Sequence, residues 1–233
     1  MDWGYILSVT LQSAFGIEAI VFALAAIGLN LQFGYTGLLN FGQSAFLAVA
    51  AYSLAVTVTE LHLNFWVGIA AGLLGAVVLA LLLGIPTLRL RADYLAIVTI
   101  AASEIVRLLV RSVTLKNIFG GSDGMRDFAS GFYAMNPVPV GQYSIGPVTL
   151  NQDKVFILIV GWALVALALL ITFLLVRSPW GRVLKGIRED EDAVRSLGKN
   201  TYAVKMQSLI IGGVLGCLGG FVYSLGYQNV GPD

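Results

Sequence analysis

The 233-residue sequence is poor in charge and has almost no cysteine. Only 12% of its residues are charged, whereas 58% are hydrophobic; a soluble domain usually carries about 25% charged residues. A chain of this size therefore has too little polar surface to cover a water-soluble globule, which excludes a soluble enzyme or binding domain and indicates an integral membrane protein. The single cysteine, Cys217, excludes a disulfide framework within the chain.

Several functional motifs are also missing from the sequence. There is no GxxxxGK[ST] nucleotide-binding loop, so the chain is not expected to hydrolyse ATP itself. The one histidine, His62, has no second ligand nearby, and no nucleophile–base pair stands out, so we expect no metal, no cofactor and no enzymatic activity. The N-terminus lacks the basic region of a cleaved signal peptide.

Apolar segments of membrane-spanning length dominate what is present. A hydrocarbon core of about 30 Å needs roughly 20 apolar residues as helix. We therefore expect an all-α, polytopic transmembrane helical bundle that forms a single domain over residues 1–233, with about six spans. The predicted spans cover residues 5–29, 41–59, 66–85, 94–109, 155–176 and 204–225.

The positive charges predict how the chain is oriented. No Lys or Arg precedes Arg89, and seven of the fourteen fall between Arg177 and Lys205. Because cytoplasmic loops are enriched in Lys and Arg, residues 177–203 should be cytoplasmic. Alternation of the spans then places the long polar segment 112–154 on the extracytoplasmic side and the short turn 88–93, with Arg89 and Arg91, on the cytoplasmic side.

Residues 28–46, GLNLQFGYTGLLNFGQSAF, are unusually rich in glycine and hydrogen-bonding side chains for a membrane segment. Broken membrane helices persist where they are buried in protein or line a wet cavity, and transporters place such breaks at the substrate site. We therefore predict a broken, glycine-rich helix beside a substrate pathway, with close helix packing as the alternative. Asn40, Gln43 and Ser44 are expected to share one face of the next helix. The predicted pathway residues are Gly34, Tyr35, Gly37, Asn40, Gln43 and Ser44.

The charged segment 177–203 carries a hidden apolar stripe. Pro179 follows Ser178 as at a helix start, and Gly198 is placed to end a helix. One or two short amphipathic helices are predicted, which either rest on the membrane surface or dock in a groove of a soluble partner. The expected stripe is Val183, Ile187, Val194 and Leu197, with Leu184 near its edge.

The same segment resembles the cytoplasmic coupling loop of ABC-importer permeases. That loop has Glu-Ala-Ala, three residues and then Gly; here Asp192, Ala193 and Val194 precede Gly198 at this spacing, with Asp and Val as departures. The stretches GLNLQFGYTGLLNFGQSAFLAVAAY, LRLRADYLAIVTIAASEIVRLL and GGSDG occur in the order seen in the LivM-type permease family of branched-chain amino acid importers. The resemblance covers about residues 20–233.

The resemblance implies a transport subunit of a prokaryotic inner membrane rather than a whole transporter. Its implied partners are a second, homologous permease, two cytoplasmic ATPases that carry ATP and Mg, and an extracytoplasmic substrate-binding protein. Branched-chain or other neutral amino acids are the implied substrates, with urea and short amides as alternatives. Family members continue past residues 229–233, so the chain is expected to be truncated. The implied coupling residues are Gly181, Arg182, Arg188, Ala193 and Gly198.

Two charged residues fall within the fourth predicted span. Glu104 and Arg107 are three residues apart, so they are expected to pair on one helix face, either as a structural ion pair or as a gate. A self-sufficient secondary transporter or channel, with Glu104 as a proton-linked carboxylate, is the alternative function; a membrane enzyme is a weaker one. The glycines from Gly212 to Gly220 predict tight helix packing in the last span.

Overall fold

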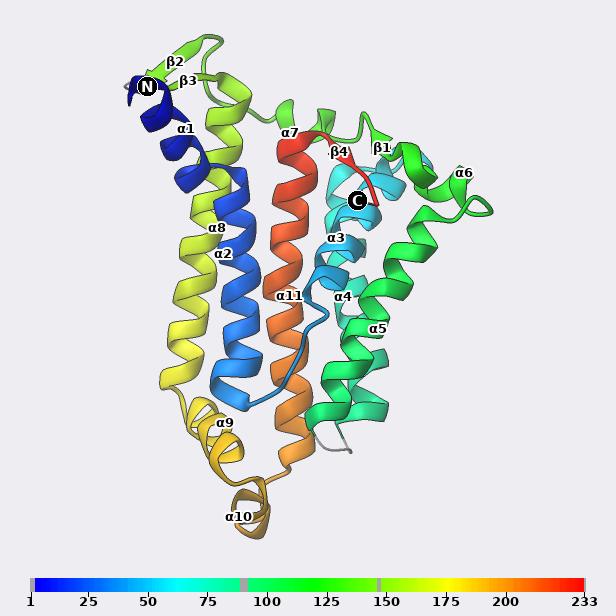
Figure 1. Ribbon diagram of the computed structural model, residues 1–233, viewed down its shortest axis with the longest axis vertical. Coiled ribbons are helices and arrows are strands. Elements are labelled where there is room, and N and C mark those ends of the chain that lie inside the picture. Colours follow the sequence, from blue (N-terminus) through cyan, green and yellow to red (C-terminus); the bar gives the residue numbers. More distant parts are fainter. Residues whose placement is uncertain (1–2, 89–91, 146–147, 233) are drawn as a thin grey trace.

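The computed structural model shows an elongated bundle of long helices and describes residues 3–88, 92–145 and 148–232 (Figure 1). Helices α9 (Pro179–Glu189) and α10 (Glu191–Ser196) lie beyond one end of the bundle, and segment 112–154 covers the other end. Segments 112–154 and 177–203 therefore lie at opposite ends, as two loops on opposite sides of a membrane would. The predicted turn with Arg89 and Arg91 lies outside the described residues.

Each predicted span contains a helix, but their lengths differ. Within the described residues, the helical stretches that are long and apolar enough to cross a membrane are Ile6–Tyr35, Phe65–Thr87, Gln152–Arg177 and Thr201–Tyr227. The other two spans correspond to the shorter apolar α3 and to the charged α5. The helices of the bundle are α1 (Trp3–Phe15), α2 (Ile17–Leu29), the π-helix η1 (Asn30–Tyr35), α3 (Gln43–Thr59), α4 (Phe65–Thr87), α5 (Ala92–Arg111), α8 (Gln152–Arg177) and α11 (Thr201–Tyr227).

The first span differs from the predicted range of residues 5–29. It bends at Gly16, whose backbone is extended, and α1 tilts away from α2 at this point (Figure 1). A Cβ at Gly16 would lie 2.2 Å from the carbonyl oxygen of Gln12, so the tight bend favours glycine there. The span also continues beyond residue 29 through η1 to Tyr35, because the polar residues that follow Leu29 stay helical.

Helix α11 lies at the centre of the bundle and packs on α2, α3 and α4. A Cβ on Gly212 would lie 2.6 Å from the carbonyl oxygen of Gly28, and one on Gly220 would lie 2.1 Å from that of Leu47. These distances are shorter than any real Cβ contact, so the α11 backbone approaches its neighbours through its glycines. The predicted tight packing of the last span is confirmed.

Segment 112–154 folds into short elements that cap the bundle. Strands β2 and β3 form an antiparallel hairpin in which Gln142 pairs with Asn151. Strand β1 pairs with β4, which follows α11, and Met125 lies opposite Val230. The cap is thereby tied to the last described residues of the chain. Its elements are α6 (Lys116–Phe119), the 3-10 helix η2 (Gly121–Asp123), β1 (Met125–Arg126), α7 (Ser130–Tyr133), β2 (Gln142–Ile145), β3 (Val148–Asn151) and β4 (Asn229–Val230).

Candidate functional site

The chain reverses direction inside the bundle between η1 and α3. Helix α2 continues into η1, residues 37–42 are not helical, and α3 begins at Gln43. Figure 1 shows this segment returning from the α9 end of the molecule along α11, so that α3 begins within the bundle. Gly37 has φ of +75°, the left-handed region that favours glycine. We call residues 30–43 the re-entrant segment.

Three buried amide side chains hold the re-entrant segment against α11. The Asn40 amide donates to Gln32 Oε1 at 2.8 Å and to Gln43 Oε1 at 3.4 Å. Gln32 in turn donates to the carbonyl of Leu209 at 3.0 Å, and Gln43 donates to that of Gly212 at 3.2 Å. All three amides are at most 8% exposed. The network supplies the hydrogen bonds that buried polar groups require in a membrane protein.

Hydroxyl groups extend the same network. Thr36 Oγ1 donates to the carbonyl of Leu31 at 3.0 Å and lies 2.6 Å from Ser208 Oγ on α11. On the other side, the Phe41 amide donates to Thr99 Oγ1 of α5 at 3.1 Å. Thr36, Ser208, Thr99 and Gln32 were not predicted as site residues. Gln32 and Thr36 lie in the polar stretch 28–46 that the sequence singles out. The only signal for Thr99 and Ser208 is that each is polar within an otherwise apolar span.

The predicted shared face of Asn40, Gln43 and Ser44 is wrong. Asn40 lies before α3, in the non-helical part of the re-entrant segment, and Gln43 is the first residue of the helix. Gln43 is buried, whereas Ser44 is exposed. Successive residues of a helix point about 100° apart, so Ser44 cannot join the face that Gln43 occupies. The structure therefore brings Asn40 and Gln43 together and leaves Ser44 outside the network.

Helix α9 (Pro179–Glu189) contacts the other end of the re-entrant segment. The Arg188 guanidinium donates a hydrogen bond to the carbonyl of Gly34. Lys185 Nζ lies 5.8 Å from the centre of the Tyr35 ring, within the range of a cation–π contact. Gly34, Tyr35 and Arg188, which were assigned to two separate predicted sites, therefore meet at one end of the bundle.

A cavity of about 220 Å³ lies where the re-entrant segment, α4, α5, α9, α10 and α11 come together. Arg188 and Lys205 supply positive charge and Glu191 supplies negative charge, while leucine and isoleucine side chains supply apolar surface. Because charged and apolar groups share the lining, the cavity suits a small molecule with both characters. Its lining includes Gly37, Leu38, Leu95, Ile187, Arg188 and Lys205.

A larger cleft of about 750 Å³ lies between α1, α2, α8 and the β3 strand. It is lined by residues such as Phe15, Trp162 and Tyr227, and Trp162 Nε1 donates to the carbonyl of Phe15 at 3.1 Å. None of the predicted site residues lines this cleft. We therefore assign the candidate site to the smaller cavity, which touches both predicted regions.

Helix α9 begins as the sequence predicts. Pro179 is its first residue, and the hydroxyl of Ser178 accepts a hydrogen bond from the Gly181 amide at 3.4 Å. Gly181 is buried against the end of α8, where a Cβ would lie 2.2 Å from the carbonyl oxygen of Val176. The predicted coupling residue Gly181 therefore allows a tight turn between α8 and α9. Arg182, the next residue, is exposed.

The expected apolar stripe is confirmed at Ile187, which is buried, but it is wrong at Leu197 and in placing Leu184 at its edge. The buried face of α9 is Gly181, Leu184 and Ile187, and Leu184 is fully buried rather than peripheral. The helix stops at Glu189, because Asp190 adopts an extended backbone and caps the next helix, so the stripe does not continue. Leu197 caps the end of α10 rather than lying on α9, and it is 79% exposed.

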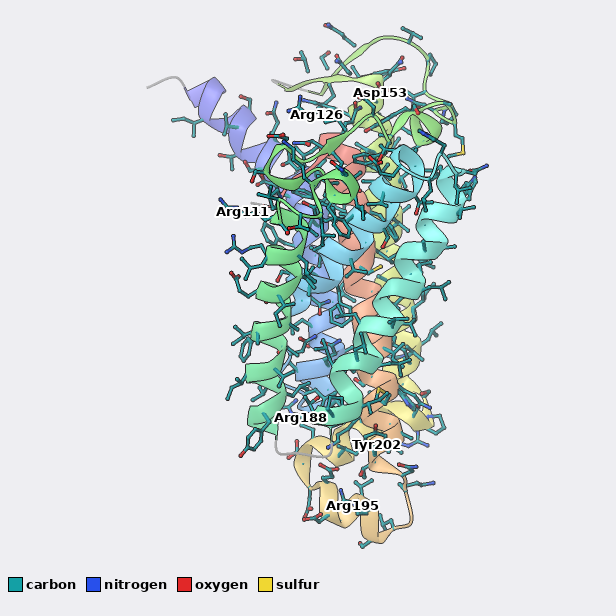
Figure 2. The ribbon with its side chains drawn as sticks, turned by 90° about the vertical axis from the view of Figure 1, so that its right-hand side faces the viewer. Arg111, Arg126, Asp153, Arg188, Arg195 and Tyr202 are labelled. Carbon is teal, nitrogen blue, oxygen red and sulfur yellow. The ribbon has the colours of Figure 1, made fainter. Side chains whose placement is uncertain are left out.

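Helix α10 (Glu191–Ser196) forms the tip of the molecule (Figure 1). The side chain of Asp190 accepts a hydrogen bond from the Ala193 amide at 3.0 Å at its start. At its end, Gly198 has φ of +76°, and its amide donates to the carbonyl of Arg195 at 3.0 Å. The predicted end of the helix at Gly198 is confirmed as a Schellman-type cap. Figure 2 shows Arg195 at this tip and Arg188 closer to the bundle.

An ion pair ties α10 to the foot of α11. Glu191 Oε2 lies 2.8 Å from Lys205 Nζ, and Glu191 Oε1 accepts hydrogen bonds from Thr201 and Arg195 at 3.0 Å each. Burial tends to raise the pKa of Glu191, but Lys205, Thr201 and Arg195 together outweigh burial and hold that pKa below its ordinary value. Glu191 is therefore charged at neutral pH and fixes the base of α10.

The predicted pair on α5 is present. Arg107 Nη2 lies 2.7 Å from Glu104 Oε1, and Arg107 Nε donates to Glu104 Oε2 at 3.0 Å. The two side chains are 43% and 52% exposed and do not line the cavity. Figure 2 shows α5 along one edge of the molecule, with Arg111 near its upper end. This pair is therefore separate from the candidate site.

Known proteins resemble this chain along most of its length. Residues 13–233 match the family described as "Branched-chain amino acid transport system / permease component". The chain is 31% identical to the high-affinity branched-chain amino acid transport system permease protein LivM of Escherichia coli (strain K12), over 92% of this chain and 52% of that protein. It is 27% identical to the probable branched-chain amino acid transport permease protein LivM of Methanocaldococcus jannaschii, over 93% and 66% respectively.

A second type of permease is also similar. The chain is 25% identical to the LivH permease protein of Salmonella typhimurium, over 91% of this chain and 68% of that protein. No solved structure matches. The chain spans about half the length of the LivM proteins from Escherichia coli and Salmonella typhimurium. With its apolar spanning helices and this similarity, the chain is a multi-pass inner-membrane protein, and it belongs to the permease family of branched-chain amino acid transport systems.

Proposed function

We propose that this chain is a permease subunit of an ABC importer that moves branched-chain or other neutral amino acids across the inner membrane. The observation that carries the proposal is the family match over residues 13–233. Relatives that are 31–33% identical are named as high-affinity branched-chain amino acid permeases. Transport is driven by separate ATPase subunits, and a substrate-binding protein delivers the amino acid at the end covered by segment 112–154.

The α9–α10 hairpin is the proposed contact with the ATPases. Helix α10 protrudes beyond the bundle and exposes Ala193 and Leu197. An exposed apolar residue beside charged neighbours suits a helix that docks in a groove of a soluble partner. Exposed Arg182 adds charge to the same hairpin, and Gly198 fixes the end of the docking helix.

Motion of the hairpin would reach the re-entrant segment through α9. Arg188 joins α9 to Gly34, and Ile187 lines the same cavity as Gly37. When an ATPase shifts α10, α9 therefore changes the shape of the cavity at the cytoplasmic end. The contact of α9 with the re-entrant segment is the proposed link between ATP use and access to the pathway.

The substrate pathway is proposed to pass through the cavity beside Gly37. Gly34 and Tyr35 contact α9 and lie just before the lining residues in sequence. Asn40 and Gln43 hold the re-entrant segment through their amide hydrogen bonds. Apolar side chains and opposite charges in one cavity are the groups that a zwitterionic amino acid with an apolar side chain would bind. Exposed Ser44 is assigned to the pathway only if a partner chain covers it.

The proposal is tested by capturing ATPase subunits with the tagged chain in detergent. Wild-type protein is expected to retain the ATPases, whereas Gly198→Pro should lose them, because proline cannot adopt the φ of +76° found there. Lys199→Ala, one residue further, is the matched control. Amino acid uptake that persists in vesicles without any ATPase subunit would overturn the proposal and favour a secondary transporter. Competition of uptake by urea or short amides tests the substrate class.

A further inference from the structure

We propose that the outward face of α5 is the surface on which this chain pairs with a second, homologous permease, with Glu104 and Arg107 at its centre. The inference rests on the proposed function, because an importer of this kind requires a second permease chain. It adds the surface that the partner occupies and the chemistry that the partner must supply there.

The outward face of α5 forms one continuous stripe along the helix. Its members up to Arg107 follow one another at spacings of three and four residues, and Leu108 lies four residues after Glu104, which places them on one side of an α-helix. The opposite side carries Leu95 and Val110, which are 1% and 4% exposed and pack into the bundle. In both views α5 lies at the edge of the molecule (Figures 1 and 2). The α5 face consists of Tyr94, Ile97, Ile100, Glu104, Arg107 and Leu108.

The charges make this face unsuitable for contact with lipid. Glu104 lies seven residues before Arg111, which is about 10 Å along a helix axis, so it lies inside α5 and away from that end of the helix. The apolar Ile100 and Leu108 lie one turn to either side of it. Charged side chains are costly in the hydrocarbon core of a bilayer, and charges in membrane helices face protein or water for that reason. About half of each side chain remains exposed among the described residues. A protein surface on the outer side of α5 removes this cost.

A homologous permease is the partner that fits such a face. The chain resembles both LivM and LivH proteins over more than 90% of its length, so both kinds of permease share its order of helices. A two-fold axis along the membrane normal brings equivalent helices together at the same depth. Glu104 and Arg107 can then exchange hydrogen bonds with polar groups across the axis. Ile97, Ile100 and Leu108 surround them with apolar contact area, as in a protein–protein interface.

The first test is photo-crosslinking in native membranes that contain the complete importer. A photoreactive phenylalanine analogue replaces Ile97 or Leu108, which are 64% and 54% exposed. The matched controls are Leu82 on α4 and Leu174 on α8, which are 66% and 59% exposed. The α5 positions are expected to form adducts with the second permease, identified by mass spectrometry, and the controls are not.

Two results of that experiment would overturn the inference. Adducts from α5 only with lipid would show that the face is lipid-exposed. Adducts only within the same polypeptide would show that another segment of this protein covers it. Capture of the ATPases is measured in the same preparation. If the ATPases are retained but the second permease crosslinks elsewhere, the proposed function stands and the α5 interface fails; if neither partner is captured, the proposed function fails.

The second test asks whether the ion pair acts only within α5. Glu104→Lys is expected to reduce recovery of the second permease by roughly tenfold or more, because it places like charges side by side at the contact. The exchange variant, Glu104→Arg with Arg107→Glu, keeps an intrahelical pair and should elute as a single folded species. Its recovery of an unaltered partner should remain low. Full recovery of the partner by the exchange variant would show that the pair stabilises only its own helix.

Discussion

The re-entrant segment and the α9–α10 hairpin differ in which side chains they bury and which they expose. In the re-entrant segment the amides of Gln32 and Asn40 are at most 1% exposed, and their hydrogen bonds go to neighbouring amides and to the α11 backbone. In the hairpin, Leu197 is 79% exposed and the charged groups around it face solvent. Inside a membrane a polar side chain has to find protein partners, whereas outside it an exposed apolar side chain calls for one.

The two regions are nevertheless connected. The guanidinium of Arg188 bonds to the Gly34 carbonyl, and Lys205 joins α11 to Glu191 at the base of α10. These two contacts join a buried region to a protruding one, so a displacement of the hairpin would be transmitted to the bundle. Substitutions in the first region should therefore act mainly on stability, and those in the second mainly on partner binding.

The largest effect is expected from crowding the contact between α2 and α11. A Cβ at Gly28 would lie 2.2 Å from the Gly212 carbonyl oxygen, so Gly28→Val should lower the free energy of unfolding by about 3 kcal/mol. Thermal unfolding in detergent measures the change. Gly141→Val is the control, since the nearest side-chain atom to a Cβ there is 4.0 Å away. An unchanged melting temperature for Gly28→Val would contradict the close packing.

Removal of one amide from the network should have the next largest effect. Gln43→Leu leaves the Gly212 carbonyl and the Asn40 amide each without one partner, so we expect a loss of about 2 kcal/mol in the free energy of unfolding. Ser44→Ala, at the exposed neighbouring position, should change it by less than about 0.5 kcal/mol. Equal losses for the two variants would show that burial does not distinguish these positions.

A smaller, local effect is expected at the end of α10. Gly198→Ala places a side chain at φ of +76°, which costs about 1 kcal/mol in the left-handed region. The cost falls on the cap of α10 and not on the bundle. Affinity for the ATPase subunits should therefore fall while the melting temperature of the detergent-solubilised chain stays constant. A lower melting temperature with unchanged affinity would be the opposite of this expectation.

The smallest effect is a pH dependence of the hairpin. The pKa of Glu191 is lowered in the folded chain, so its ion pair with Lys205 contributes above the ordinary glutamate pKa of about 4.3 and is lost as pH falls through the lowered value. A spin label at position 197, with Cys217 replaced by alanine, should become more mobile below that pH. Glu191→Gln should show the mobile spectrum at every pH; a label that stays immobile in this variant would exclude the ion pair as the fixing contact.

Local signals allowed part of the structure to be predicted from the sequence. Pro179 and Gly198 mark helix ends because each residue type favours the backbone geometry found there. Glu104 and Arg107 pair because a spacing of three residues places both side chains on one face of the helix. Such features depend on neighbours within a few residues. They are therefore visible without knowledge of the packing.

The long-range contacts were not predictable in the same way. In a membrane protein both the lipid-facing and the buried sides of a helix are apolar, so periodicity does not tell which side packs inward. Outside the membrane, Leu184 was placed at the edge of a stripe for a different reason: the stripe was drawn across the break between α9 and α10, although Leu184 is fully buried on α9. Gln32 bonds to Leu209, which is 177 residues away, and Ser208 bonds to Thr36, which is 172 residues away. No local pattern relates these residues.

The most direct test compares one substitution from each region in the same reconstituted importer. Thermal stability and ATPase capture are measured together for Gln43→Leu and Leu197→Asp. We predict that Gln43→Leu lowers the melting temperature and still captures the ATPases, and that Leu197→Asp loses the ATPases at an unchanged melting temperature. If Leu197→Asp retains the ATPases while Gln43→Leu loses them without any loss of stability, the assignment of docking to the hairpin and of structural support to the re-entrant network is contradicted.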